Sequence, residues 1–149
     1  AAGMSRPALY LLYPNKNAVF ADVAVSLLEA CYAQAEAAWP PDAPLAAALA
    51  AALLAKDLAL FRLLEASPHG AEILSEGMVL TLEAHAAIAE RFRALLVSRF
   101  AAAGAAAPDE LARMVTKAAD GLKHAGGSEA DYVADVQRLA ALVAAAVPR

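Results

Sequence analysis

Residues 44–66 read PLAAALAAALLAKDLALFRLLEA, an alanine- and leucine-rich run between two proline-containing stretches. Alanine and leucine are among the strongest helix formers, and a helix that is apolar on most sides is expected to be surrounded by others. The run is about as long and apolar as a membrane span. However, it contains Lys56, Asp57 and Arg62, and charges inside a span are costly. We therefore interpret it as the buried, central helix of an all-helical domain.

The composition of the whole chain supports an all-α fold. Alanine supplies 44 of the 149 residues, whereas isoleucine and threonine, which favour strands, occur twice each. The length suits one domain with a core of its own. A single cysteine, Cys31, excludes an internal disulfide framework and a cysteine-built metal site. Because the N-terminus also lacks the pattern of a secretory signal, we expect a cytoplasmic protein that does not enter a membrane.

Proline and glycine divide the chain into helical stretches. We expect helices over 16–39 with Asn15 as the cap, over 44–66, over a short turn at 70–75 and over 78–103, and then a terminal hairpin. Two apolar stripes at helical spacing are predicted to face the core. The first stripe comprises Phe20, Val23, Leu27, Cys31, Gln34 and Ala38, and the second comprises Met78, Leu82, His85, Ala89, Phe92, Leu96 and Phe100.

The terminal hairpin has clear helix-start signals. Pro108 suits a first helical turn, where Asp109 and Glu110 complement the helix dipole. Ser128 and Asp131 resemble a capping box with a shorter acid. Each helix has one apolar stripe and many small residues, so two copies could pair as a four-helix bundle; alternatively, the hairpin closes its own domain. The predicted dimer interface comprises Leu111, Val115, Ala118, Leu122, Tyr132, Val136, Leu139 and Val143.

The first 17 residues differ from the rest of the chain. They contain two basic residues, Arg6 and Lys16, and no acidic residue, which indicates an anionic partner for this end. Gly3 suits a turn that leads into a short helix from Arg6 to about Tyr13, the second half of a helix-turn-helix. A cation at Lys16 opposes the dipole of the next helix. Together with the free backbone N–H groups of the first turn, however, it could form a phosphate-binding site. The alternative is a solvated surface lysine.

Residues 2–20, AGMSRPALYLLYPNKNAVF, closely resemble the signature of TetR-family transcriptional repressors, from the turn through the recognition helix to the lysine that opens the fourth helix. The downstream order of helices is similar to that family as well. The resemblance implies a TetR-like helical bundle. In it, residues 1–17 would be the C-terminal part of a helix-turn-helix DNA-binding domain, and residues 18–149 an effector-binding and dimerisation domain. It also implies a homodimeric repressor of operator DNA that a small-molecule effector releases.

The resemblance assigns DNA-binding roles near the N-terminus. Arg6 is the best candidate for a base edge, because arginine can bind guanine through two atoms. Leu11 and Leu12 depart from the family pattern, in which one of these side chains is often polar or aromatic. The first two helices of the pattern are absent from this sequence, so we expect this chain alone not to bind an operator strongly. The predicted DNA-binding residues are Ser5, Arg6, Pro7, Ala8, Tyr10, Tyr13 and Lys16.

An effector would sit among the long helices, and we expect it to be small and largely apolar because few buried charges are available. His85 is the ionisable member of its stripe and could hold a polar group, although such a histidine also fits an ordinary core. The other candidates are apolar and also suit a core. The predicted pocket comprises Trp39, Phe61, Met78, Leu82, His85, Phe92 and Met114.

The sequence offers little for catalysis. His69, His85 and His124 show no metal-ligand spacing, and there is no glycine-rich phosphate loop. We therefore expect no enzyme activity, no metal and no cofactor. The alternative function is a helical protein-interaction module that has lost DNA binding, which the apolar pair Leu11 and Leu12 favours.

Overall fold

The computed structural model describes residues 11–40, 42–66, 81–125 and 127–147, without the side chains of residues 60, 61 and 63–66. This part of the chain contains five helices and no strand, so the expected all-α class is confirmed. The predicted short turn at 70–75 lies outside the described residues. The helices are α2 (Lys16–Ala37), α3 (Leu45–Ala66), α5 (Leu82–Ala102), α6 (Pro108–His124) and α7 (Glu129–Ala146).

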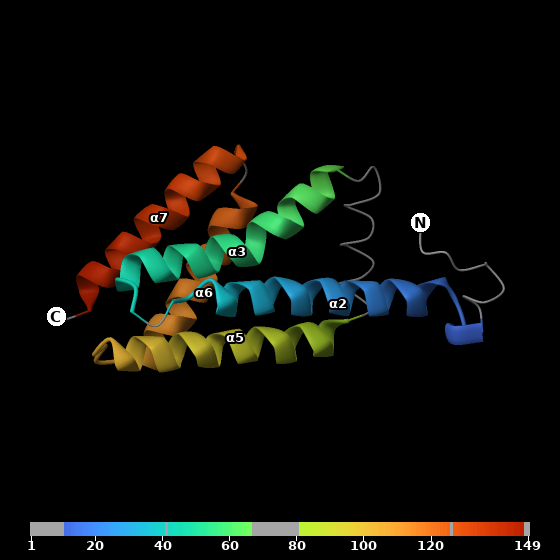
Figure 1. The fold of residues 1–149 in the computed structure, drawn as a ribbon, viewed down its shortest axis with the longest axis horizontal. Helices are drawn as coiled ribbons and strands as arrows, with labels where there is room; N and C mark the ends of the chain where they lie inside the picture. The colour runs from blue at the N-terminus through green and yellow to red at the C-terminus, as the bar shows by residue number, and fades with distance from the viewer. Residues whose placement is uncertain (1–10, 41, 67–80, 126, 148–149) are drawn as a thin grey trace.

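The five helices pack in a closed ring. Contacts join α2 to α3, α3 to α7, α7 to α6, α6 to α5, and α5 back to α2. In Figure 1, α2 and α5 run side by side, and α7 lies on the far side of α3 from α2. Each helix therefore buries side chains against two neighbours. The junction between α2 and α5 is where the first and third of these helices in the sequence meet.

Local signals determine where the helices begin. The Asn15 Oδ1 accepts a hydrogen bond from the backbone N–H of Ala18 at 3.0 Å, as predicted for a cap. Pro108 occupies the first turn of α6. The Ser128 Oγ accepts the N–H of Asp131, whose carboxylate in turn accepts the N–H of Ser128, so the predicted capping box is confirmed.

The core lies inside the ring and contains residues of all five helices. Its largest fully buried side chains come from four of the five helices, and the aromatic rings of Trp39 and Phe100 meet edge-to-face at 6.4 Å between centroids. The predicted burial of residues 44–66 is confirmed for the first half of α3, which contacts two neighbouring helices as every other helix of the ring does. The largest fully buried side chains of the core are Phe100, Leu49, Leu53, Leu96, Val115 and Val136.

The predicted stripes are only partly correct. On α2 the buried residues are Cys31 and Ala35, followed by Trp39 beyond the helix end, whereas Val23 and Gln34 are exposed. Alanine occupies several faces of this helix, so its apolar periodicity does not single out one face. On α5 the stripe residues Phe92, Leu96 and Phe100 are buried as predicted. Nearer the start of α5 the prediction is wrong: Leu82 faces solvent, whereas Ile88 and Thr81, the residue just before the helix, are buried.

One of the described helices, α2, combines the length and the apolar composition needed to cross a bilayer. It lies near the N-terminal end of the described chain, and few residues of its most apolar stretch are buried. Core helices of other proteins and signal sequences have the same length and composition, so these two properties do not distinguish a membrane span.

Candidate functional site

Two of the predicted DNA contacts, Tyr13 and Lys16, belong to the stretch where the chain enters α2. Lys16 is the first residue of α2 and is exposed, with its Nζ 4.7 Å from the centroid of the Phe20 ring. The Tyr13 hydroxyl donates a hydrogen bond to the Asp22 carboxylate. This bond raises the pKa of Tyr13 above its ordinary value. The other predicted contacts, Ser5, Arg6, Pro7, Ala8 and Tyr10, lie outside the described residues.

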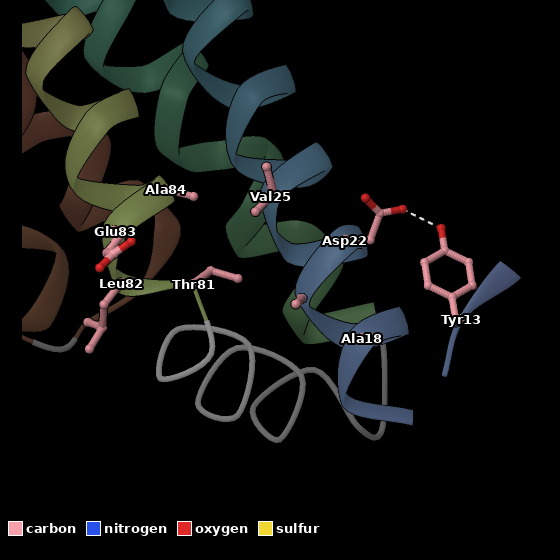
Figure 2. A pocket seen from close by; sticks show the side chains of 9 residues that line it. Tyr13, Ala18, Asp22, Val25, Thr81, Leu82, Glu83 and Ala84 are labelled. Carbon is pink, nitrogen blue, oxygen red and sulfur yellow. Dashed lines mark hydrogen bonds between the residues drawn. The ribbon is translucent and has the colours of Figure 1, made fainter. Parts of the chain in front are cut away.

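A first open groove of about 690 Å³ separates the N-terminal parts of α2 and α5. Figure 2 shows Tyr13 bonded to Asp22 on the α2 side, with Thr81 and Glu83 on the α5 side. Among the described residues that line it, the charged ones, Asp22 and Glu83, are both acidic. The lining residues are Tyr13, Ala18, Ala21, Asp22, Val25, Thr81, Leu82, Glu83 and Ala84.

A second groove of about 540 Å³ lies farther along the same junction. The rings of Tyr32 and Phe92 meet edge-to-face within it, 5.4 Å apart between centroids and 66° between planes. Burial raises the pKa of Tyr32 to about 12, so its phenol is neutral near pH 7. The lining residues are Glu29, Tyr32, Ala33, Glu36, Ile88, Arg91, Phe92, Ala94 and Leu95.

Behind the second groove, the core contains a buried cluster of charged groups. Asp57, which is 3% exposed, accepts hydrogen bonds from the Lys56 ammonium at 2.8 Å and from the Tyr132 hydroxyl at 2.6 Å. The Lys123 Nζ lies 3.5 Å from the same carboxylate and 3.8 Å from Asp120. Lys56 is itself 7% exposed, and its Nζ lies 5.7 Å from the ring centroid of Tyr32.

The cluster holds its groups in fixed charge states. Burial alone would raise the pKa of Asp57, but the charges of Lys56 and Lys123 and two hydrogen bonds outweigh it, so that pKa lies below its ordinary value. Burial, and then the nearby carboxylate, raise the pKa of Tyr132. Burial and the same carboxylate also raise the pKa of Cys31. Asp57 is therefore ionised while Tyr132 and Cys31 are neutral near pH 7.

Sequence reasoning misses this cluster as a site. From the sequence, Lys56 and Asp57 are expected only to exclude a membrane span. Two adjacent, opposite charges within an apolar run nevertheless indicate a buried ion pair. Tyr132, 75 residues away from Asp57, is predicted instead to lie in a dimer interface.

The described members of the predicted effector pocket lie in different parts of the fold. Of these residues, Leu82 lines the first groove and Phe92 lines the second. Trp39 is buried in the core, His85 is half-buried, and Leu82 and Met114 are 63% and 56% exposed. The Phe61 side chain and Met78 lie outside the described part. Helical spacing identified apolar positions, but which of them face one another depends on how the helices pack.

The apolar stripes of the terminal hairpin face the interior of this chain. Val115, Tyr132, Val136 and Val143 are buried in its core, which includes residues of α3 and α5. Leu111, Leu122 and Leu139 pack against the same core from its edge, and Ala118 is half-buried. The four buried side chains are not available on the surface to meet a second copy.

Comparison with known proteins gives no relative for this arrangement. No protein-family model matches the chain, and neither the curated proteins nor the solved structures contain a match. Within the described residues, no group of three or more side chains could hold a metal ion.

Proposed function

We propose that this chain belongs to a ligand-responsive, DNA-binding transcriptional regulator, a homodimeric repressor that a small, largely apolar effector releases from its operator. The observation that carries the proposal is the exposed Lys16 at the capped N-terminus of α2, directly after the helical residues Leu11 and Leu12 and the break at Pro14. This arrangement is what the resemblance to TetR-family regulators implies for residues 11–16.

The physical case rests on the charge at the start of α2. A lysine in the first turn opposes the helix dipole, so a bound phosphate that neutralises both would offset this cost. Lys16 is exposed, which leaves its ammonium accessible to such an anion. The proposal requires the Tyr13 hydroxyl to exchange Asp22 for phosphate, because in this structure the hydroxyl donates to that carboxylate.

The same helix links this end to the two grooves. Both grooves lie between α2 and α5, and Tyr13 and Lys16 lie at one end of α2. A ligand that changes how α2 packs on α5 would therefore move both side chains. Such a ligand shifts DNA binding only through its different affinities for the two arrangements.

The experiment is a selection from a random duplex DNA library with the full-length product of the gene that encodes this chain. Binding of the enriched duplex is then measured across a salt series for the wild type, for Lys16→Gln and for the control Lys117→Gln on the surface of α6. Each phosphate contact contributes about 0.9 to the slope of log K against log salt. We expect Lys16→Gln to reduce the slope by about 1 per subunit and Lys117→Gln to leave it unchanged.

The second candidate function is a helical protein-interaction module without DNA binding. It is favoured by the exposure of Leu11, which is 87% exposed, and of Leu12 beside it. It predicts that the selection enriches no sequence and that residual DNA binding does not depend on Lys16. Either result would overturn the repressor proposal.

A further inference from the structure

We propose that the second groove between α2 and α5, defined by Glu29, Tyr32, Glu36, Arg91 and Phe92 and called here the aromatic groove, binds a hydrophobic organic cation. That this binding is the regulatory signal rests on the proposed function, whereas the binding itself does not.

The size and floor of the aromatic groove suit such a ligand. Its volume of about 540 Å³ falls in the range of small-molecule sites, about 300–1,000 Å³. Tyr32 and Phe92 form a pair of rings there, and burial raises the pKa of the Tyr32 phenol to about 12, so it stays neutral even at pH 10. Because the Lys56 ammonium already lies over both rings, they contribute to the site by burying the apolar part of the ligand.

The rim of the groove supplies the charge. Glu29 and Glu36 are seven residues apart on α2, so they share a face, and Tyr32 lies between them. Both carboxylates are exposed, and within the described chain neither side chain forms an ion pair or a hydrogen bond; the same holds for Arg91 on the α5 side. Two carboxylates against one guanidinium give the described lining residues of the rim a net charge of −1.

The buried cluster behind the rings does not reverse this preference. The Lys56 Nζ lies 5.7 Å and 5.9 Å from the ring centroids of Tyr32 and Phe92. Asp57 contacts this ammonium at 2.8 Å, and Asp57 and Asp120 both lie within 3.8 Å of Lys123. Two ammonium groups and two carboxylates cancel, so the sign of the charge at the rim decides which ion enters.

The test uses two ions of nearly the same shape and opposite charge, tetraphenylphosphonium and tetraphenylborate. Isothermal titration and thermal shift at low salt compare their binding to the wild-type chain, to Glu29→Gln/Glu36→Gln and to the control Asp42→Asn in the exposed connection before α3. We expect the wild type to prefer the cation. The double variant should lose about tenfold or more of that affinity, since two nearby charges in a partly exposed site each contribute on the order of a few-fold. The control should match the wild type.

A second variant locates the ligand on the rings. Tyr32→Leu removes the ring and with it most of the apolar area that the residue offers to the ligand, so cation affinity should fall, while thermal stability without ligand shows whether the fold is retained. Tyr32→Phe, which keeps the ring, should retain the affinity.

Three results would overturn the inference: preference for the borate anion, equal binding of both ions, or cation binding that the double variant retains in full. None of these measurements uses DNA. A chain that binds the cation through Glu29 and Glu36 but enriches no duplex would refute the proposed function alone. An operator-binding protein that ignores the cation would refute this inference alone.

Discussion

Replacing Asp57 by asparagine tests the buried charge cluster most directly. The substitution keeps the size of the side chain but removes its charge. Asp57 is 3% exposed, and its carboxylate accepts bonds from Lys56 at 2.8 Å and from Tyr132 at 2.6 Å. The Asp57→Asn variant would leave the Lys56 ammonium, itself largely buried, without its closest counter-charge.

The expected cost is large for a domain of this size. Removing one partner of a buried ion pair destabilises a protein by about 3–5 kcal/mol, because the remaining charge stays desolvated. The free energy of unfolding of a whole domain is typically about 5–15 kcal/mol. At about 2–4 °C per kcal/mol for a chain of this length, the midpoint of thermal unfolding should fall by about 6–20 °C.

Urea unfolding, followed by circular dichroism and by the fluorescence of Trp39, the single tryptophan, measures this cost. The informative comparison is the triple variant Lys56→Met/Asp57→Leu/Tyr132→Phe, which removes the charges and the hydroxyl together. Because apolar replacements of buried ion pairs are often neutral or stabilising, the triple variant should be more stable than Asp57→Asn.

The pH dependence gives an independent check. The pKa of Asp57 in the folded chain lies below its ordinary value of 3.8. The stability that this carboxylate contributes is therefore fully present above that value and is lost as pH falls through the lower pKa of the folded state. The difference in unfolding free energy between wild type and Asp57→Asn should be constant from pH 7 to about pH 5 and should shrink below about pH 4.

The reasoning is refuted if Asp57→Asn costs less than about 1 kcal/mol at pH 7, or if the triple variant is the less stable of the two. The first result would mean that water or a moved side chain compensates the Lys56 charge, and the second that the polar contacts stabilise the fold more than their apolar replacements do.

The packing and the helix ends give three further predictions. Phe100→Ala should cost about 3–5 kcal/mol in urea unfolding, because Phe100 is fully buried. Leu142→Ala, on the exposed face of α7, should cost less than about 0.5 kcal/mol, and equal costs would contradict the assigned core. Ser128→Ala removes the two hydrogen bonds of the Ser128 hydroxyl with Asp131, while the backbone N–H of residue 128 keeps its bond to the carboxylate, and it should cost about 1 kcal/mol; an unchanged urea midpoint would show that the hydroxyl contributes nothing to the cap. Burial raises the pKa of Cys31, so Ellman's reagent should label it slowly in the native chain at pH 8 and rapidly in urea, whereas fast native labelling would place this thiol at the surface.

The helix starts could be predicted because each depends on a few neighbouring residues. Asn15 contacts a backbone N–H three residues ahead, and Ser128 and Asp131 cap each other over the same distance. The buried face of α2 could not be predicted in the same way. Its alanines make several faces equally apolar, and the face that packs on α3 and α5 begins at Cys31 and Ala35 rather than at Val23.

The candidate sites show the same division. The exposed Lys16 at the start of α2 is expected from its position behind Asn15 and Pro14. The aromatic groove is not expected from the sequence, because Tyr32 and Phe92 are 60 positions apart and belong to different helices. The predicted pocket includes Phe92 but places it with Leu82, which lines the other groove of the α2–α5 junction.

Taken alone, the order of residues determined that this chain is helical and where most of its helices begin, because helix propensity and capping act within one turn of the backbone. Tertiary packing decided what each helix buries. It turned the stripes of the terminal hairpin inward and brought Tyr132 and Lys123 to the carboxylate of Asp57. These pairings depend on which helices become neighbours in the ring, and no interaction between residues close in sequence specifies that.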